Sequence, residues 1–193
     1  EAPSAAVGHY VNSTGDSDGT AENSAQTNIN NVFGASTANL NGTDEVIEFP
    51  ITPSSTEVTV SGWAKATDFL TDQRFVYLYD STGAGVGEQI IGSLWLDKDG
   101  ANVGWASQAR NTAFTASTIG TDNSDGSTDW QYITLYMSNS LHSMYVNGVL
   151  TASAATTGTA NTLAADTLQI GRAVSLTGDS NHFKGGVGDV SFF

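Results

Sequence analysis

Two glutamates, Glu45 and Glu48, are the carboxylates whose spacing comes nearest to that of a hydrolytic enzyme. A glycosidase needs a nucleophile and a general acid that project from the same surface. Residues three apart in a strand point to opposite faces, and no aspartate lies between these two glutamates. The pair therefore cannot act as a glycosidase dyad, and because the chain has no cysteine, thiol nucleophiles are excluded as well.

The three histidines, His9, His142 and His182, lie too far apart in sequence to indicate a shared metal site. His142 shares one face of a predicted strand with Met144 and Val146. It is either a core histidine bonded to a backbone carbonyl or a residue at the mouth of a concave face that contacts a ligand.

Aromatic side chains offer either core packing or a platform for a sugar ring. Trp95 lies between Leu94 and Leu96 and so faces away from both, whereas Trp105 shares a face with Val103. Either tryptophan, together with a nearby tyrosine, has the chemistry to stack on a sugar. The residues that we predict to contact a ligand are Trp95, Trp105, Tyr77, Tyr79 and His142.

Acidic residues gather in segments that also carry glycine, such as Asp97-Lys98-Asp99-Gly100 and Asp122 to Asp129. Asp-Gly and Ser-Asp-Gly sequences form tight turns, which explains each segment without a ligand. None of them matches the twelve-residue calcium loop of an EF-hand through its final glutamate.

These side chains must be positioned by strands, which the final third of the chain shows best. Residues 132 to 137 alternate between apolar and hydroxyl-bearing faces, the period of a strand. Asn147-Gly148 predicts a type I′ hairpin turn that leads into a strand from Val149. Gly185, Gly186 and Gly188 precede or interrupt a terminal strand, where glycines permit a bulge or a close backbone approach.

Upstream, strands are predicted at 9–11, 46–49, 57–66, 74–79, 89–96 and 102–106, with turns between them. The polar stretch from Asn12 to Asn31 predicts a long loop, because it has too few apolar residues for a core element. No helical period stands out. The pattern predicts an all-β protein with two packed antiparallel sheets in a sandwich.

In order along the chain, six segments resemble the laminin-G-like jelly roll of the concanavalin A-like lectin and glucanase superfamily. They are 39–50, 59–65, the strand after Trp130, Tyr145-Val146-Asn147-Gly148, Leu168-Gln169-Ile170-Gly171-Arg172 and Phe183 to Val190. The resemblance covers nearly the whole chain and implies that Trp63 and Trp130 are framework residues of the core. Gly188-Asp189 departs from the paired acids of the family pattern.

The same resemblance implies a structural Ca²⁺, because jelly-roll relatives often hold one with a late aspartate and oxygen atoms from an early loop. Hard oxygen ligands suit this ion, and no thiolate is present to favour a softer one. The predicted ligands are Asp189, Asp44, Asn41, Gly42 and Asn39.

Composition limits the partners. Twenty acidic residues against six basic ones give a net charge of −14, which repels nucleic acid and anionic membranes. No apolar run is long enough to span a bilayer. The length and 39% hydrophobic content favour one jelly-roll domain over residues 1–193, with 1–8 as an N-terminal extension.

Together these observations predict a non-catalytic recognition or adhesion module that binds a glycan or a protein surface. The acidic surface, rich in small polar residues, favours an extracellular location or the surface of a virion. The alternative is a structural subunit, such as a capsid-decoration or appendage protein, that assembles with identical copies. A polysaccharide-active enzyme is the weakest alternative, since its carboxylates are missing.

Overall fold

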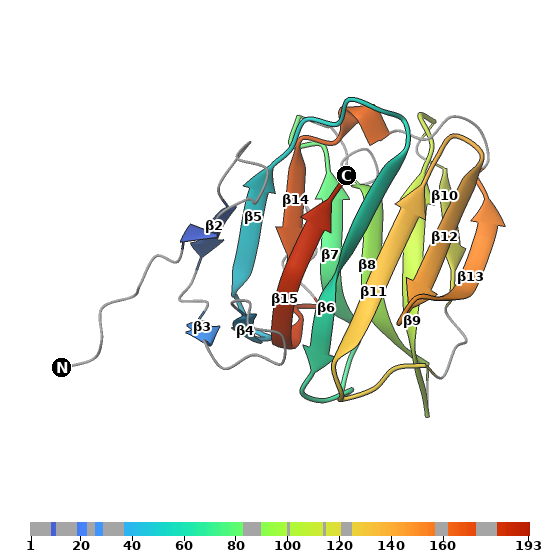
Figure 1. The fold of residues 1–193 in the computed structure, drawn as a ribbon. Coiled ribbons are helices and arrows are strands. Elements are labelled where there is room, and N and C mark those ends of the chain that lie inside the picture. Colours follow the sequence, from blue (N-terminus) through green and yellow to red (C-terminus); the bar gives the residue numbers. More distant parts are fainter. Residues whose placement is uncertain are drawn as a thin grey trace.

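The computed structural model describes the backbone alone at residues 9–10, 19–22, 26–28 and 37, and the chain in full at 38–82, 90–99, 101–113, 115–120, 125–156, 162–172 and 181–193. The predicted N-terminal extension, 1–8, lies outside the described residues. Within them the protein is an antiparallel sandwich of two sheets, as predicted (Figure 1).

The first sheet, sheet A, has eight strands in the spatial order β1-β2-β5-β14-β7-β8-β9-β10. Their bounds are His9–Tyr10 (β1), Gly19–Glu22 (β2), Val46–Pro50 (β5), Thr167–Ile170 (β14), Gln73–Tyr79 (β7), Ile90–Asp99 (β8), Asn102–Arg110 (β9) and Ala116–Ile119 (β10). A single 3-10 turn, η1 (Thr162–Ala164), precedes β14.

The second sheet, sheet B, has seven strands in the order β13-β12-β11-β6-β15-β4-β3 and lies in front of sheet A in Figure 1. Their bounds are Val149–Ala155 (β13), Leu141–Val146 (β12), Gln131–Met137 (β11), Val58–Ala66 (β6), Lys184–Phe192 (β15), Thr37–Asn41 (β4) and Gln26–Asn28 (β3).

Inward side chains of both sheets form one core. The alternation predicted for β11 is present, because Ile133, Leu135 and Met137 are buried while the residues between them are half-buried. Phe75 from sheet A packs edge-on against Trp105 at 5.8 Å between ring centroids and lies 5.6 Å from Phe183. Burying such apolar surface is the main favourable term in forming the sandwich.

The predicted hairpin turn is confirmed. Asn147 and Gly148 both have positive φ, 52° and 79°, as a type I′ turn requires. The Asn147 side chain also accepts a hydrogen bond from the Tyr132 amide at 2.8 Å, which ties the turn to β11.

The predicted loop from Asn12 to Asn31 is wrong in part, because β2 and β3 lie within it. Both are short strands near the edges of their sheets, and they pair with β5 and β4 through the backbone. Backbone pairing needs no apolar side chains, so a polar composition did not exclude it.

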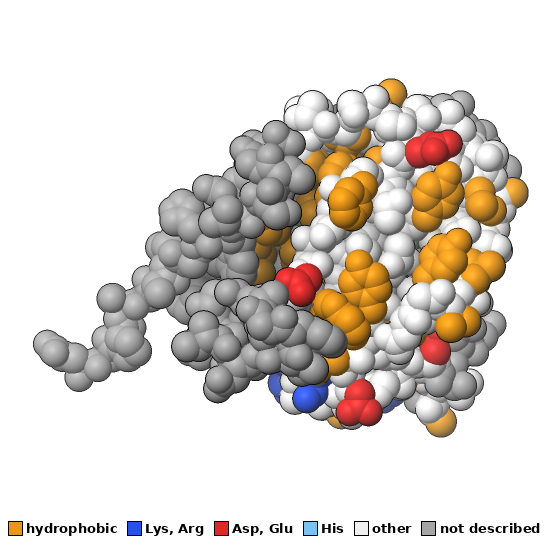
Figure 2. All heavy atoms as spheres, viewed as in Figure 1, with side chains coloured by type: hydrophobic (Ala, Val, Ile, Leu, Met, Phe, Trp, Pro, Cys, Tyr) orange, Lys and Arg blue, Asp and Glu red, His pale blue; other side chains and the backbone are white. Residues whose placement is uncertain are grey.

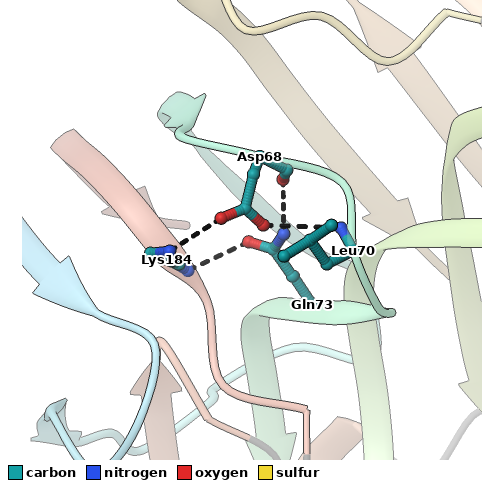
Figure 3. A network of polar contacts seen from close by, with 4 residues as sticks. All are labelled: Asp68, Leu70, Gln73 and Lys184. Atoms are coloured by element: carbon teal, nitrogen blue, oxygen red, sulfur yellow. Dashed lines mark hydrogen bonds and ion pairs between the residues drawn. The ribbon is translucent and has the colours of Figure 1, made fainter.

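A polar network joins the two sheets at one end of the sandwich (Figure 3). Lys184 on β15 forms an ion pair with Asp68 at 2.7 Å, and its amide donates to the Gln73 side chain at 3.0 Å. The Gln73 amide group in turn donates to the Asp68 carbonyl at 2.6 Å. The loop between β6 and β7 is thereby held against β15.

Candidate binding face on sheet A

A row of polar side chains crosses the outer face of sheet A. The cross-strand register places them side by side on five neighbouring strands, and they are Glu48, Gln169, Tyr77, Ser93 and Gln108. Their neighbours along the strands, such as Leu168, Leu78 and Leu94, belong to the core. Side chains alternate across a strand, so the row itself points outward.

Several members of this outer face are recessed rather than exposed. Gln169 is 0% exposed, Ser93 2%, Tyr77 4% and Trp95 5%. Glu48, Arg74, Tyr79 and Gln108 are half-buried and remain accessible. A ligand that approaches this face would meet these four side chains first.

Arg74 and Trp95 form the cationic part of the face. The Arg74 guanidinium lies 4.2 Å from the centre of the Trp95 ring, and the Trp95 indole donates to Asp97 at 3.0 Å. Arg74 Nε is buried and has no hydrogen-bond partner among the described residues. Burial lowers the pKa of Arg74, and Tyr77, Asp72 and Asp97 oppose that shift through space.

Gln169 carries the second atom of this face, after Arg74 Nε, that has no hydrogen-bond partner among the described residues. Its amide nitrogen donates to Glu48, which also pairs with Arg172 at 3.5 Å. Gln169 Oε1 is buried and accepts no hydrogen bond from the described residues. A buried polar atom without a partner is uncommon in native proteins and requires an explanation such as an absent water or ligand.

The two tyrosines predicted as ligand contacts lie together here. The Tyr77 and Tyr79 rings are 6.5 Å apart, centroid to centroid. Burial raises the pKa of Tyr77 to about 12 and also raises that of Tyr79, so both hydroxyls stay protonated and able to donate.

The three arginines of the chain are all on this face. Arg74 stacks on Trp95, Arg110 Nε donates to Gln108 at 3.3 Å, and Arg172 pairs with Glu48. Planar guanidinium and amide groups donate along fixed directions. With the accessible side chains of Glu48, Tyr79 and Gln108 they form a surface suited to binding.

Two predicted ligand residues are in the core instead, and their assignment to a ligand face is wrong. Trp105 is 1% exposed, packs against Phe75 and donates from its indole to Gln131 at 2.9 Å. His142 is 0% exposed. Its strand alternates as predicted, but that alternation directs the ring into the sandwich.

His142 is therefore a core histidine, and the Ser107 backbone lies close enough to its ring to influence its pKa. Neither ring nitrogen has a partner of normal geometry among the described residues, and the same holds for the buried Ser107 hydroxyl. Burial lowers the pKa of His142 to about 4, and the nearby Ser107 backbone opposes the shift.

Trp63 and Trp130 differ from their predicted core positions. Both are half-buried on the outer side of sheet B. Trp63 lies 5.2 Å from Tyr132, whose hydroxyl bonds to Ser61, and the Trp130 ring covers Gly186, where an added Cβ would lie 2.7 Å from it. Figure 2 shows hydrophobic side chains in orange gathered on this face.

The structure does not bring the predicted calcium ligands together. Asn41 pairs with Lys184 and Thr37 with Gly188, so Asp189 lies just beyond the far end of the β4 pairing, roughly 16 Å along β15 from the loop that holds Asn41, Gly42 and Asp44. Asn39 pairs with Gly186 in between. The five residues therefore do not fit one ion.

The early loop also uses its own oxygen atoms. Asn41 Oδ1 accepts from the amides of Thr43 and Asp44, at 2.7 and 3.3 Å. Among the described residues, no three His, Cys, Asp or Glu side chains lie close enough to hold a metal. Calcium binding by this chain stays a prediction, and Asp189 is removed from the predicted site.

Sequence reasoning missed Arg74 and Gln169. The signal was present for Gln169, because a polar residue between Leu168 and Ile170 must point away from the core. For Arg74 it was obscured by the bulge between Arg74 and Val76, which places two consecutive apolar residues against the core.

This architecture is matched by a family model and by several solved structures. The family model described as the concanavalin A-like lectin/glucanases superfamily matches residues 41–193. No curated protein matches the chain.

Among solved structures, the chain is similar to domain 4 of AbnA, an extracellular arabinanase from Geobacillus stearothermophilus in complex with arabinotriose, with TM-score 0.68, 18% identity and coverage of 93% of this chain and 84% of that one. It is similar to the native heptameric SAP-like pentraxin from Limulus polyphemus, with TM-score 0.61, 14% identity, and 81% and 74% coverage.

The receptor-binding domain of botulinum neurotoxin mosaic serotype C/D has TM-score 0.65 and 13% identity, and the match covers 93% of this chain and 43% of that domain. This chain thus spans less than half of the toxin domain. At these identities the likeness shows the fold alone. None of the helices in the described part of the chain is long and apolar enough to cross a membrane.

Proposed function

We propose that this chain, which belongs to the concanavalin A-like lectin/glucanases superfamily, is a non-catalytic recognition module that binds a glycan across the outer face of sheet A. The observation that carries the proposal is the pair of unpartnered buried atoms, Arg74 Nε and Gln169 Oε1, within one polar and aromatic face. Both atoms are shielded from solvent within a face whose accessible side chains are Glu48, Arg74, Tyr79 and Gln108, and a few convergent polar groups are typical of binding sites.

A sugar is the ligand class that this face suits. Its hydroxyl groups both donate and accept, matching the amide of Gln108, the carboxylate of Glu48 and the guanidinium of Arg74, while its C–H face suits the accessible ring of Tyr79. The complex of AbnA domain 4 with arabinotriose supports a sugar ligand on this fold.

The chemistry of the face favours binding over catalysis. Glu48, the carboxylate within the row, is held by Gln169 and Arg172, and Glu45 instead accepts from the Asn41 amide. The two carboxylates thus have separate structural partners, whereas glycoside hydrolysis needs a pair that flanks the scissile bond.

The proposal also places the module outside the cell or on a virion surface. The net charge of −14 supports solubility in an exposed setting, and AbnA, whose domain 4 has a similar fold, is itself extracellular.

The first experiment is an array of neutral and uronic-acid oligosaccharides, arabino-oligosaccharides included, screened in Ca²⁺ and in EDTA. We expect at least one oligosaccharide to bind. Loss of binding in EDTA would support the calcium prediction, and silence across the array would overturn the glycan proposal.

The second experiment measures the affinity of the best oligosaccharide for Arg74→Met by calorimetry. We expect a loss of about tenfold or more, because a polar partner of the ligand is removed. We also expect the melting temperature to change little, because the lost stacking of the guanidinium on Trp95 is offset by removing a partly desolvated charge whose Nε has no hydrogen bond.

Lys65→Met is the matched control, since it removes an exposed cation from β6 in the opposite sheet. It should bind the oligosaccharide as the unchanged protein does. Equal affinity of Arg74→Met and the unchanged protein would show that the ligand binds elsewhere.

A further inference from the structure

One segment of this acidic chain carries no charged residue. From Trp130 to Ala165 the sequence has no Asp, Glu, Lys or Arg, although the whole chain has 20 acidic and six basic residues. The segment forms β11, β12 and β13, which make up one end of sheet B (Figure 1). The uncharged residues are therefore adjacent in space as well as in sequence.

The last of these strands, β13, is the edge strand of sheet B, and β10 of sheet A lies near it without pairing with it. It pairs with β12 on one side, and no described residue pairs with its other side. Every residue of β13 is exposed or half-buried, and Val149 and Leu150 are 68% and 52% exposed. Natural sheets usually protect such edges with lysine, proline or a bulge.

β13 has little of that protection. Its sequence, Val149 to Ala155, has neither a charge nor a proline. A bulge at Thr151 shifts the register between Met144 and Tyr145, which leaves a regular run from Ala152 to Ala155. The strand can therefore accept a partner over a short length.

The backbone groups that would bind this partner follow from the hydrogen-bond pattern. The Thr156 amide donates to the Ser140 carbonyl at 3.1 Å. Antiparallel pairs alternate between bonded and non-bonded positions, so Ala154 bonds to β12 whereas Ser153 and Ala155 direct their backbone groups outward.

We infer that the outer edge of β13 pairs with β13 of a second copy of this chain, continuing sheet B across the two molecules. Two copies that each carry −14 repel one another over most of their surfaces, so the uncharged edge is where they can approach. Pairing the same strand in both copies gives a closed two-fold dimer.

The exposed side chains beside the edge agree with this partner. Leu150 on β13 lies opposite Tyr145 on β12 in the register, so an exposed leucine and a tyrosine lie side by side near this edge. Figure 2 shows the hydrophobic side chains of this outer face extending toward β12. Uncharged, aromatic-rich surface is typical of the centre of protein interfaces. The inference does not rest on the proposed glycan site, which is on the other sheet.

The test is sedimentation equilibrium from about 5 µM to about 500 µM protein at physiological salt. Because the regular edge is short, we expect a weak dimer, with half of the chains dimeric at a protein concentration of about 100 µM. Ser153→Lys should remain monomeric throughout, because it puts a charge on the seam of both copies. Ser54→Lys, which makes the same change at an exposed loop residue, should dimerise as the unchanged protein does.

Hydrogen exchange of the unchanged protein gives a second readout that needs no variant. We expect the amides of Ser153 and Ala155 to exchange more slowly at about 500 µM than at about 5 µM. A monomer at every concentration would overturn the inference and leave this surface to another partner, such as an uncharged polysaccharide. A dimer that persists in Ser153→Lys, with no added protection at β13, would overturn it equally.

Discussion

At the scale of single residues, His142 shows what a buried titratable group costs. Its ring is 0% exposed and has no hydrogen-bond partner of normal geometry among the described residues. A charged imidazolium in this position would lack both water and an anion, so burial lowers the pKa of His142 to about 4. His142 thereby makes the core sensitive to acid.

The pH dependence follows from linkage. The unfolded chain binds a proton at a pKa of 6.5 and the folded chain at about 4, so the contribution of His142 is fully present above pH 6.5 and is lost as the pH falls toward 4. The loss amounts to about 3 kcal/mol at most. We expect His142→Met to flatten the curve of unfolding free energy against pH between 4 and 6.5.

Urea titrations at several pH values measure this effect as the difference between the variant and the unchanged protein, which cancels the carboxylates common to both. Ser107→Ala, which alters the neighbouring buried hydroxyl without removing the titrating group, should keep the original slope. Parallel curves for His142→Met and the unchanged protein would contradict the prediction.

At the scale of elements, two glycines are required for different reasons, one for close packing between strands and the other for its backbone conformation. Gly185 on β15 has φ +146°, and an added Cβ would lie 2.0 Å from the Lys65 carbonyl oxygen of β6. Gly148, in the hairpin between β12 and β13, has φ +79° and nothing within 4 Å of an added Cβ. The same substitution therefore has different physical costs in the two places.

We expect Gly148→Ala to cost about 1 kcal/mol, the conformational price of a positive φ for alanine. Gly185→Ala should cost about 3 kcal/mol or more, because the two central strands of sheet B must separate. Urea unfolding of both variants measures the difference, and each serves as the control for the other. Equal costs would show that backbone crowding at β15 does not matter.

At the scale of the whole molecule, net charge opposes both folding and association. The chain has 20 acidic and six basic residues, and only two ion pairs are found among the described residues, Arg172 with Glu48 and Lys184 with Asp68. Surface pairs contribute at most about 1 kcal/mol each. Salt weakens both these two ion pairs and the repulsion among the excess acidic residues. The loss of repulsion should be the larger of the two effects.

We expect the melting temperature to rise as NaCl is increased from about 0.02 M to about 0.5 M, since the Debye length shortens and the repulsion is screened. The proposed dimer should tighten over the same range. Scanning calorimetry and sedimentation measure the two effects, and KCl controls for specific effects of the cation. A melting temperature that falls with salt would contradict this account.

The fold was predictable because its information is local. Alternation in 132–137 and the Asn147-Gly148 turn each depend on residues that are close along the chain. The strand order was not visible in the residues, because pairing such as that of β14 between β5 and β7 depends on contacts distant in sequence.

The candidate site divides in the same way. The sequence by itself determined that Trp95 and Tyr77 point away from their apolar neighbours, since the period of a strand requires it. Tertiary structure alone decided that Arg74 lies over Trp95, that Trp105 is inside, and that Asp189 is far from Asn41. Alternation assigns a side chain to one of two faces, but only the packing of two sheets determines which face is covered and which strands meet.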